Sequence, residues 1–173
     1  ERPIIECVQT SEDNKYARFV VEPLERGFGT TLGNSMRRVL LSSLPGVAAK
    51  AVRIEGVKHE FMTIPGVKED VTDIILNIKG LVARLYNDNE KTVAIRATGP
   101  CEVKAGDIIT DSSVEIVNPD MHIATLNADA KLNMEIILAK GRGYIPAEKN
   151  KYPDMAIDVI AVDSIFSPVR KIN

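Results

Sequence analysis

The sequence predicts an α+β protein in which short strands outnumber helices. Residues 31–44 and the segment that begins at Val71 have the apolar spacing of helices, whereas most of the remaining chain alternates apolar and polar residues as strands do. The 173 residues, 45% of them hydrophobic, are enough to bury the core of one domain or of two small ones.

The chain opens with a predicted β-hairpin. Residues 3–9 and 16–22 have strand character, and the SEDNK segment between them supplies the aspartate and asparagine that favour turns. After Pro23, the segment LERGFGTT predicts a loop, because Gly27 and Gly29 permit backbone angles that other residues avoid.

A helix is predicted over residues 31–44. Thr30 or Thr31 can cap its first amides, and Pro45 followed by Gly46 ends it. Its apolar residues cover more of the circumference than one buried stripe requires, which favours a helix that lies between its own domain and a partner. These residues are Leu32, Met36, Val39, Leu40, Leu41 and Leu44.

Alternation with a period of two follows from Val47. It predicts a strand around Val52 and Ile54 and a second over residues 57–61, with a bend or bulge at Gly56. An acidic KED segment then leads into the clearest amphipathic helix, where negative charge favours the helix dipole. The apolar residues of this helix are Val71, Ile74, Ile75, Ile78, Leu81 and Val82.

Residues 84–164 predict mainly strands. The turn signals NDNEK, TGP, KAGD, NPD, NAD and KGRG divide this part into short segments, and no long repeat is present. The longest apolar stretch, residues 71–85, is interrupted by polar and charged residues, so we expect no membrane-spanning helix and no membrane partner.

Composition argues against several functional classes. The 22 lysines and arginines against 24 aspartates and glutamates give a net charge of −2, which predicts no general nucleic-acid-binding surface. Cys7 and Cys101 are far apart, which suggests neither a disulfide framework nor a zinc site and favours a reducing, cytoplasmic setting. The start lacks a secretory signal and an initiator methionine, so we expect it to be trimmed.

No grouping of residues predicts catalysis. The Gly27-x-Gly29 pair departs from the dinucleotide-binding fingerprint, since Leu32 occupies the position of the third glycine. His59-Glu60 lacks the second histidine of a zinc hydrolase, and His122 is not grouped with a nucleophile.

Two alternative functions remain open at this point. The loop from Gly27 to Gly33 could hold an anion at a helix N-terminus, as in a stand-alone phosphate-ligand enzyme. The run from Lys140 to Tyr144 combines two cations, two glycines and an aromatic ring, as in a nucleic-acid-binding loop. A tight packing turn and a partner-facing turn are the simpler interpretations of the two segments.

Five segments in order resemble one family. They are VEPLERGFGTTLGNSMRRVLLSSLP (21–45), GVKHEFMTIPGVKEDVTDIILNIKGL (56–81), DSSVEIVNPDMHIATL (111–126), KGRGYIPAEKN (140–150) and VDSIFSPVRKI (162–172). Together they are similar to the N-terminal region of the α subunit of bacterial DNA-dependent RNA polymerase, over nearly the whole chain.

The resemblance implies two subdomains. An assembly and dimerisation subdomain, incomplete at its C-terminal side, comprises residues 1–46 and 163–173, and a β-rich subdomain is inserted at residues 47–162. In the family the chain continues into a further strand and a long helix that complete the dimer interface, and then into a small domain that contacts promoter DNA. This sequence is therefore expected to be a fragment or a trimmed chain, without a stable homodimer or DNA contact of its own.

The resemblance also implies a non-catalytic scaffold. Its partners would be a second α subunit and the two large catalytic subunits, and the magnesium of the polymerase reaction would be held by a catalytic subunit, with no cofactor in this chain. The implied dimer interface is Leu32, Met36, Leu40 and Leu44. The implied interface with the large subunits is Arg26, Thr31, Asn34, Arg37, Arg38, Leu41, His59, Lys79, Val162, Asp163 and Ser164.

Overall fold

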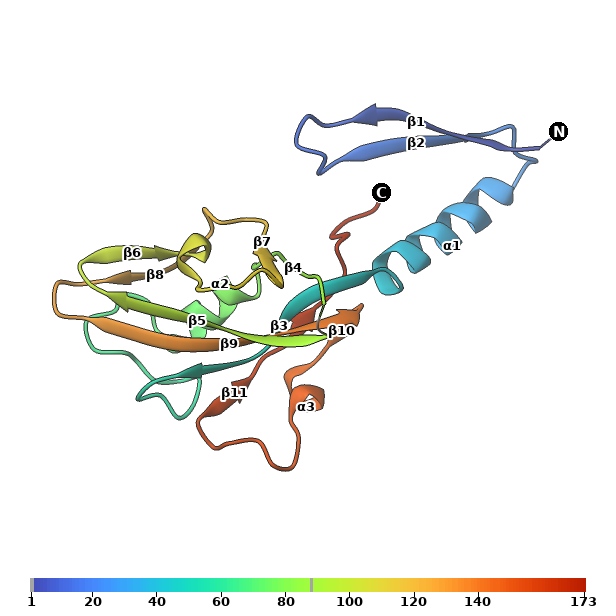
Figure 1. Ribbon diagram of the computed structural model, residues 1–173. Helices are drawn as coiled ribbons and strands as arrows, with labels where there is room; N and C mark the ends of the chain where they lie inside the picture. Colours follow the sequence, from blue (N-terminus) through green and yellow to red (C-terminus); the bar gives the residue numbers. More distant parts are fainter. Residues whose placement is uncertain (1, 88) are drawn as a thin grey trace. The chain divides into compact units, whose positions relative to one another are not determined.

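A computed structural model describes residues 2–87 and 89–173, and it confirms a mixed α and β fold in which strands predominate (Figure 1). The chain divides into two compact units, Glu1–Leu40 and Leu41–Asn173. The first unit contains a hairpin and most of one helix. The second contains the remaining strands and the hydrophobic core.

The predicted hairpin is confirmed. Strand β1 (Ile4–Thr10) pairs antiparallel with β2 (Ala17–Glu22). In the turn between them, Ser11 Oγ accepts hydrogen bonds from the backbone amides of Lys15 and Tyr16, at 3.1 and 3.0 Å. The serine thus closes the turn that the SEDNK segment predicts.

Helix α1 (Phe28–Ser42) begins three residues before the predicted start, so the second half of the predicted loop is wrong. The reversal is confined to Gly27, whose φ of +92° only glycine adopts readily, and the amide of Phe28 donates to the carbonyl of Glu25 at 3.1 Å. The helix also ends before Leu44, because Pro45 opens the next strand and disfavours helical backbone in the residue before it.

The largest sheet of the described chain is antiparallel, with strand order β11-β3-β9-β5. Its strands are β3 (Pro45–Ile54), β5 (Glu90–Thr98), β9 (Lys131–Arg142) and β11 (Val159–Ala161). Strand β9 has a period of two, since Leu132, Met134, Ile136 and Leu138 are buried on one face while Asn133 and Glu135 are exposed. This face supplies the centre of the core.

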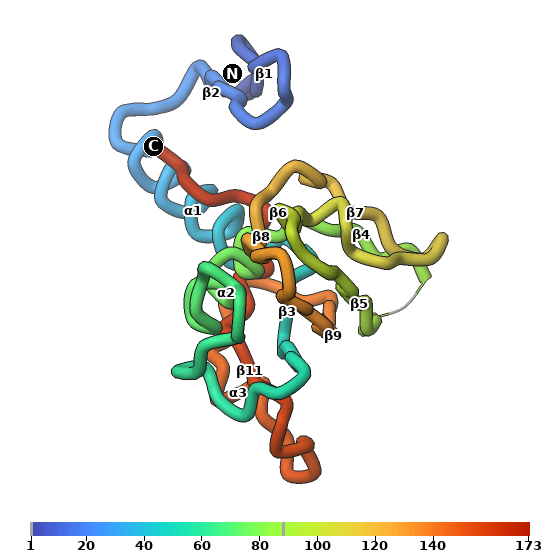
Figure 2. The backbone as a smooth tube through the Cα atoms, turned by 90° about the vertical axis from the view of Figure 1, so that its left-hand side faces the viewer, coloured from blue at the N-terminus to red at the C-terminus, as the bar shows by residue number. Residues whose placement is uncertain are grey.

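Helix α2 (Val71–Ile78) adds its apolar face to the same core. Asp70 caps it, because its carboxylate accepts a hydrogen bond from the amide of Asp73 at 2.8 Å. The helix packs against β8 (His122–Leu126) (Figure 2). Asn77 Nδ2 donates to the carbonyl of Ile123 in this strand at 2.9 Å. Leu81 and Val82 were predicted in this helix but follow its end at Ile78.

Short elements complete the second unit and confirm that residues 84–164 are mainly strands. Strand β4 (Ala83–Leu85) pairs with β7 (Val114–Ile116), β6 (Cys101–Lys104) with β8, and β10 (Tyr144–Ile145) with β12 (Ser164–Ile165). A 3₁₀ turn, η1 (Ala105–Asp107), and a short helix, α3 (Ala147–Asn150), connect them. The predicted NDNEK turn includes Asp88, which lies outside the described residues.

The predicted strand over residues 57–61 is wrong. Gly56 has a φ of +80°, and the amide of Val57 bonds to the carbonyl of Ile54 at 3.1 Å, so the chain turns away after β3. Val57 is buried, but Phe61 remains 79% exposed, so the apolar alternation does not mark a buried strand face here. In the described chain no helix is long and apolar enough to cross a membrane.

Candidate functional site

Lys79 and Asp163 form an ion pair at the C-terminal end of α2. Lys79 is the C-cap residue of the helix, and its Nζ lies 2.9 Å from Asp163 Oδ2, with both side chains partly buried. Asp163 Oδ1 accepts a hydrogen bond from the amide of Ala147 at 2.9 Å. The bonds from Lys79 and Ala147 lower the pKa of Asp163, so it stays a carboxylate.

A buried polar network fixes the backbone on both sides of Asp163. Asn150 Nδ2 donates to the carbonyl of Val162 at 2.7 Å and to Ser164 Oγ at 2.9 Å. Ser164 Oγ donates in turn to the carbonyl of Ala49 at 2.8 Å. Val162 and Ser164 are 2% and 0% exposed, so between these neighbours only Asp163 presents its side chain toward the surface.

Phe166 anchors the same C-terminal segment against two glycines. A Cβ on Gly141 would lie 2.7 Å from the Phe166 ring, and a Cβ on Gly46 would lie 1.8 Å from the Phe166 carbonyl oxygen. Gly141 therefore belongs to packed strand β9, and in the predicted KGRG turn Gly143 alone has a positive φ, of +64°. These glycines have a structural explanation without a nucleic-acid ligand.

The residues of α1 that the resemblance assigns to interfaces stay accessible. In the part of the chain that the structure describes, no residue of α1 is buried, and Met36 and Val39 are 47% and 51% exposed. Thr31, Asn34, Arg37 and Arg38 are exposed, whereas Leu32, Leu40, Leu41 and, beyond the helix, Leu44 are half-buried. The interface assignments of these residues stay predictions.

Arg26 and His59 are also exposed. Arg26 lies in the turn that precedes α1, and His59 lies in the turn region after β3, with its ring tilted against that of Phe61 at a centroid distance of 6.4 Å. Of the residues assigned to the large subunits, the structure brings Lys79 directly against Asp163, between Val162 and Ser164.

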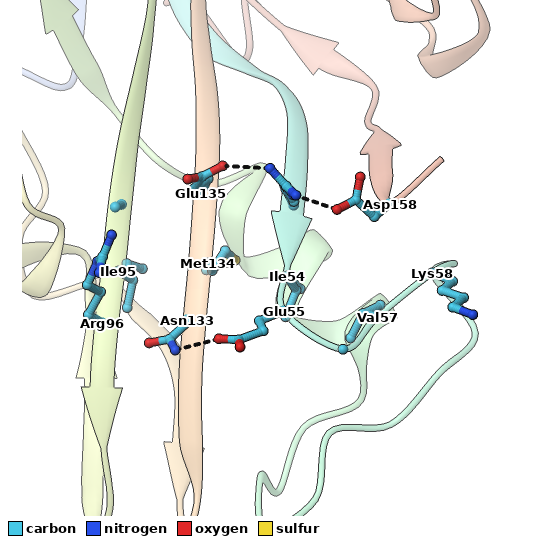
Figure 3. A pocket seen from close by; sticks show the side chains of 13 residues that line it. Ile54, Glu55, Val57, Lys58, Ile95, Arg96, Asn133, Met134, Glu135 and Asp158 are labelled. Carbon is cyan, nitrogen blue, oxygen red and sulfur yellow. Dashed lines mark hydrogen bonds and ion pairs between the residues drawn. The ribbon is translucent and has the colours of Figure 1, made fainter. Parts of the chain in front are cut away.

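A hollow on the solvent side of the main sheet has mutually paired polar residues (Figure 3). Arg53 Nε lies 2.6 Å from Asp158 Oδ2 and Arg53 Nη1 lies 3.8 Å from Glu135 Oε2, while Asn133 donates to Glu55 at 2.6 Å. Among the described residues, its charged lining consists of Arg53, Lys58, Arg96, Glu55, Glu135 and Asp158. The charged lining is therefore balanced, with three basic and three acidic side chains.

Sequence patterns gave no indication of a second polar cluster, which centres on His122. Both of its ring nitrogens contact carboxylates, those of Glu69 and Glu102, which come from different segments of the chain. In the described chain no histidine, cysteine or carboxylate group forms a set that could hold a metal ion. Cys7 and Cys101 are free thiols.

Most of the segment from Gly27 to Gly33, which could have held a phosphate as a loop, is helical. Gly29, Thr30, Thr31 and Gly33 are helical residues of α1. The structure therefore offers no extended glycine-rich cradle between Gly27 and Gly33.

Comparisons with known proteins agree on one family. Residues 52–167 match the family described as "RNA polymerase Rpb3/RpoA insert domain". Over all 173 residues the chain is 62% identical to the "DNA-directed RNA polymerase subunit alpha" of Symbiobacterium thermophilum. It is 60% and 61% identical to the proteins of that name from Desulfitobacterium hafniense and Clostridium acetobutylicum.

The chain spans about half the length of the curated relatives that it matches, 55% in each of these three. The comparisons support neither the phosphate-ligand enzyme nor the nucleic-acid-binding module.

Proposed function

Because this chain belongs to the family of bacterial DNA-directed RNA polymerase α subunits, we propose that it is the N-terminal scaffold region of such a subunit. Its function is to dimerise and to bind the two large catalytic subunits during assembly of the polymerase. The observation that carries this proposal is the 62% identity over the entire chain, since a match limited to one motif would imply much less.

The scaffold has two parts. Residues 1–46 and 163–173 contribute to an assembly and dimerisation subdomain, which the remainder of a longer chain completes, and residues 47–162 form the inserted β-rich subdomain. The working site of this scaffold is the bacterial cytoplasm, and free Cys7 and Cys101 suit that reducing setting.

Helix α1 is the first contact element. Leu32, Met36, Leu40 and Leu44 pack in the α dimer. Arg37 and Arg38 meet one large subunit, together with Arg26, Thr31, Asn34, Leu41 and His59. The accessible apolar residues of α1 support this role, because an apolar helix surface of this kind is stabilised when a partner covers it.

The Lys79–Asp163 pair is the second contact element and meets the other large subunit. Its support is geometric: the helix end at Lys79 and the connection at Asp163 form one partly buried, charged feature on a backbone that Asn150 and Ser164 hold in place. In this arrangement Val162 and Ser164 act by positioning Asp163 rather than by touching the partner.

Catalysis belongs to the complete polymerase. This chain contributes no catalytic residue and no cofactor, the magnesium ion of nucleotide addition is held by a large subunit, and this region makes no DNA contact. The net charge of −2 is consistent with a protein-binding rather than a DNA-binding role.

Reconstitution tests the proposal. The tagged chain is mixed with the two purified large subunits of a related bacterium, and the mass of each complex is measured by native mass spectrometry. We expect species that contain this chain together with a large subunit. If the complete α subunit of the relative captures the large subunits and this chain captures neither, the proposed scaffold function is wrong.

A further inference from the structure

His122, in strand β8, lies between two carboxylates on opposite sides of its ring. Its Nε2 is 2.8 Å from Glu69 Oε1, and its Nδ1 is 2.9 Å from Glu102 Oε1. Glu69 comes from the segment that leads into α2, and Glu102 comes from β6. The histidine therefore connects three elements that are separate in the sequence.

This geometry favours one protonation state of the ring. A neutral imidazole has one N–H group, and its other nitrogen is a hydrogen-bond acceptor. A carboxylate oxygen is also an acceptor, so a neutral ring can satisfy Glu69 or Glu102 but not both. Only the doubly protonated, positively charged ring donates to the two carboxylates at once.

Glu69 is held more firmly than Glu102. Its side chain is 15% exposed, against 52% for Glu102, and it also accepts hydrogen bonds from the amide of Thr125 at 2.6 Å and from Thr125 Oγ1 at 3.1 Å. Loss of the ring proton should therefore free the exposed Glu102 first. Glu69 would then keep its bonds to β8 but lose the full positive charge beside it.

The pairing of Glu69 with β8 also positions the start of α2. The amide of Lys68 donates to the carbonyl of Thr125 at 3.0 Å, and Val67 forms a β-bridge with Leu126. Asp70, the cap of α2, follows Glu69 directly. A change in the charge beside Glu69 therefore alters the interactions that hold the N-terminal end of α2.

Other charged groups nearby act on the cluster indirectly. Lys104 of β6 is the cross-strand neighbour of His122, and its Nζ lies 3.8 Å from Glu102 Oε2. Lys68 lies in the segment before α2, α2 itself carries Asp73, and Lys79, the C-cap residue of α2, is engaged with Asp163. Lys104 thus offers Glu102 an alternative partner when the ring becomes neutral.

We propose that His122 is a pH-sensitive strap. When charged, its side chain links Glu69, before α2, to Glu102 of β6, the strand that also pairs with β8 through the backbone. When neutral, it releases Glu102 and loosens the segment that leads into α2. The strap lies within the second unit, so the inference does not depend on the proposed assembly function.

The direction in which pH changes the stability of the strap follows from the pKa shifts of His122 and Glu69. The hydrogen bond that His122 donates to Glu69 raises the pKa of His122 above the ordinary 6.5, against partial burial, so the stabilisation is fully present below pH 6.5 and is lost as the pH rises through the raised value. Burial raises the pKa of Glu69, but its hydrogen bonds from Thr125 and His122 outweigh this and bring it below 4.5. The strap is therefore most stable between about pH 4.5 and 6.5.

Ring-nitrogen NMR of the chain tests the strap directly. The chain has two histidines, so a His59→Gln variant assigns the signals of His122. We expect two ring N–H groups on His122 at low pH and a titration point above 6.5. Amide hydrogen exchange at Lys68 and Thr125, corrected for intrinsic base catalysis, should then lose protection several-fold above that point, while amides in the centre of β9 keep theirs.

Two variants sharpen the result. Glu102→Gln removes an exposed charge and should lower the titration point of His122, and His122→Gln should abolish the pH dependence of protection at Lys68 and Thr125. If His122→Gln does not fold, the titration of His122 and the amide exchange of the unsubstituted chain and of Glu102→Gln still test the proposal. A titration of His122 at or below pH 6.5, or equal protection of Lys68 and Thr125 on both sides of it, overturns the proposal.

Discussion

Lys79 and Asp163 are 84 positions apart in the sequence, yet their charged groups lie 2.9 Å from each other. The pair joins the end of α2 to the short connection between β11 and β12, and the amide of Ala147 adds a third group to it. Both side chains are about a quarter to a third exposed, at 24% and 34%. A partner can therefore reach the pair without unfolding any element of the chain.

Reversing the charge at Lys79 should separate the two large-subunit contacts. In Lys79→Glu we expect binding of one large subunit to weaken about tenfold or more, because two carboxylates then face each other at the proposed contact, while the other large subunit remains bound. Pull-down with each large subunit in turn measures the two affinities. Equal loss of both would argue against two separate surfaces.

A charge swap provides the control for Lys79→Glu. The double variant Lys79→Glu, Asp163→Lys restores opposite charges and should recover the ion-pair energy, worth about 0.2–1 kcal/mol for a partly exposed site, although the amide of Ala147 loses its acceptor. If binding also recovers fully, the pair acts through the fold alone. Continued loss of binding at normal stability indicates direct contact with the partner.

Arg37 and Arg38 on α1 should be needed for capture of the first large subunit. Guanidinium groups form charge-assisted hydrogen bonds of about 1.5–3 kcal/mol, so Arg37→Ala and Arg38→Ala should each weaken binding about tenfold or more. Circular dichroism should stay unchanged, since both side chains are exposed. Lys15→Ala, in the exposed hairpin turn, is the matched loss of a positive charge. Normal binding by both arginine variants would contradict the assignment, and loss of folding would mean that the arginines serve the chain's own structure.

Ser164 should contribute to folding rather than to binding. In Ser164→Ala the carbonyl of Ala49 loses its donor and Asn150 loses one of its two acceptors, both in a buried site. We expect a decrease of about 1–3 kcal/mol in the free energy of unfolding, measured with urea. The exposed Ser112→Ala serves as the control and should change stability little. A Ser164→Ala variant as stable as the control would show that the network is not needed.

Gly141→Ala should destabilise the chain by overpacking. The added Cβ would lie 2.7 Å from the Phe166 ring, which is 4% exposed and has little room to move. A loss of about 1–3 kcal/mol is expected, and Phe166→Leu in the same chain should recover part of it. If the double variant loses the sum of the two single-variant losses in unfolding free energy, the Cβ of residue 141 does not clash with the Phe166 ring and this account of Gly141 is wrong.

The sequence predicted those elements whose apolar pattern coincides with burial. Ile74, Ile75 and Ile78 are buried at helical spacing in α2, and Val52 and Ile54 are buried at strand spacing in β3. The same alternation failed over residues 57–61, because the positive φ of Gly56 turns the chain out of the sheet. The spacing of apolar residues therefore predicts burial only where the backbone continues in the same helix or strand.

The candidate site was predictable in part, from the family resemblance rather than from apolar spacing. The family resemblance assigned Lys79 and residues 162–164 to the interface with the large subunits, whereas no local sequence pattern encodes which segment lies beside a helix end. The contacts of His122 had no such guide, because Glu69 and Glu102 reach it from two other segments. Their meeting depends on the pairing of β6 with β8 and on the packing of α2.

The chain of 173 residues should not form a stable, uniform homodimer in isolation. Apolar side chains of the first unit remain more than half exposed, among them Ile4, Ile5, Val8, Phe19, Phe28 and Val39. Obligate dimer interfaces commonly bury about 2,000 Å² or more, and α1 alone can supply only part of such an area. The relatives are nearly twice as long, and we expect their additional segments to cover the rest.

Sedimentation velocity distinguishes the outcomes. Uncovered apolar surface should give monomer together with heterogeneous aggregate, and the aggregate should decrease in Ile5→Lys, which places a charge on the exposed hairpin. Ile157→Lys is the matched control, since Ile157 is 90% exposed but lies in the second unit. A single dimeric species whose proportion does not change on dilution would contradict the prediction, because the contacts of β1, β2 and α1 would then suffice to close the interface.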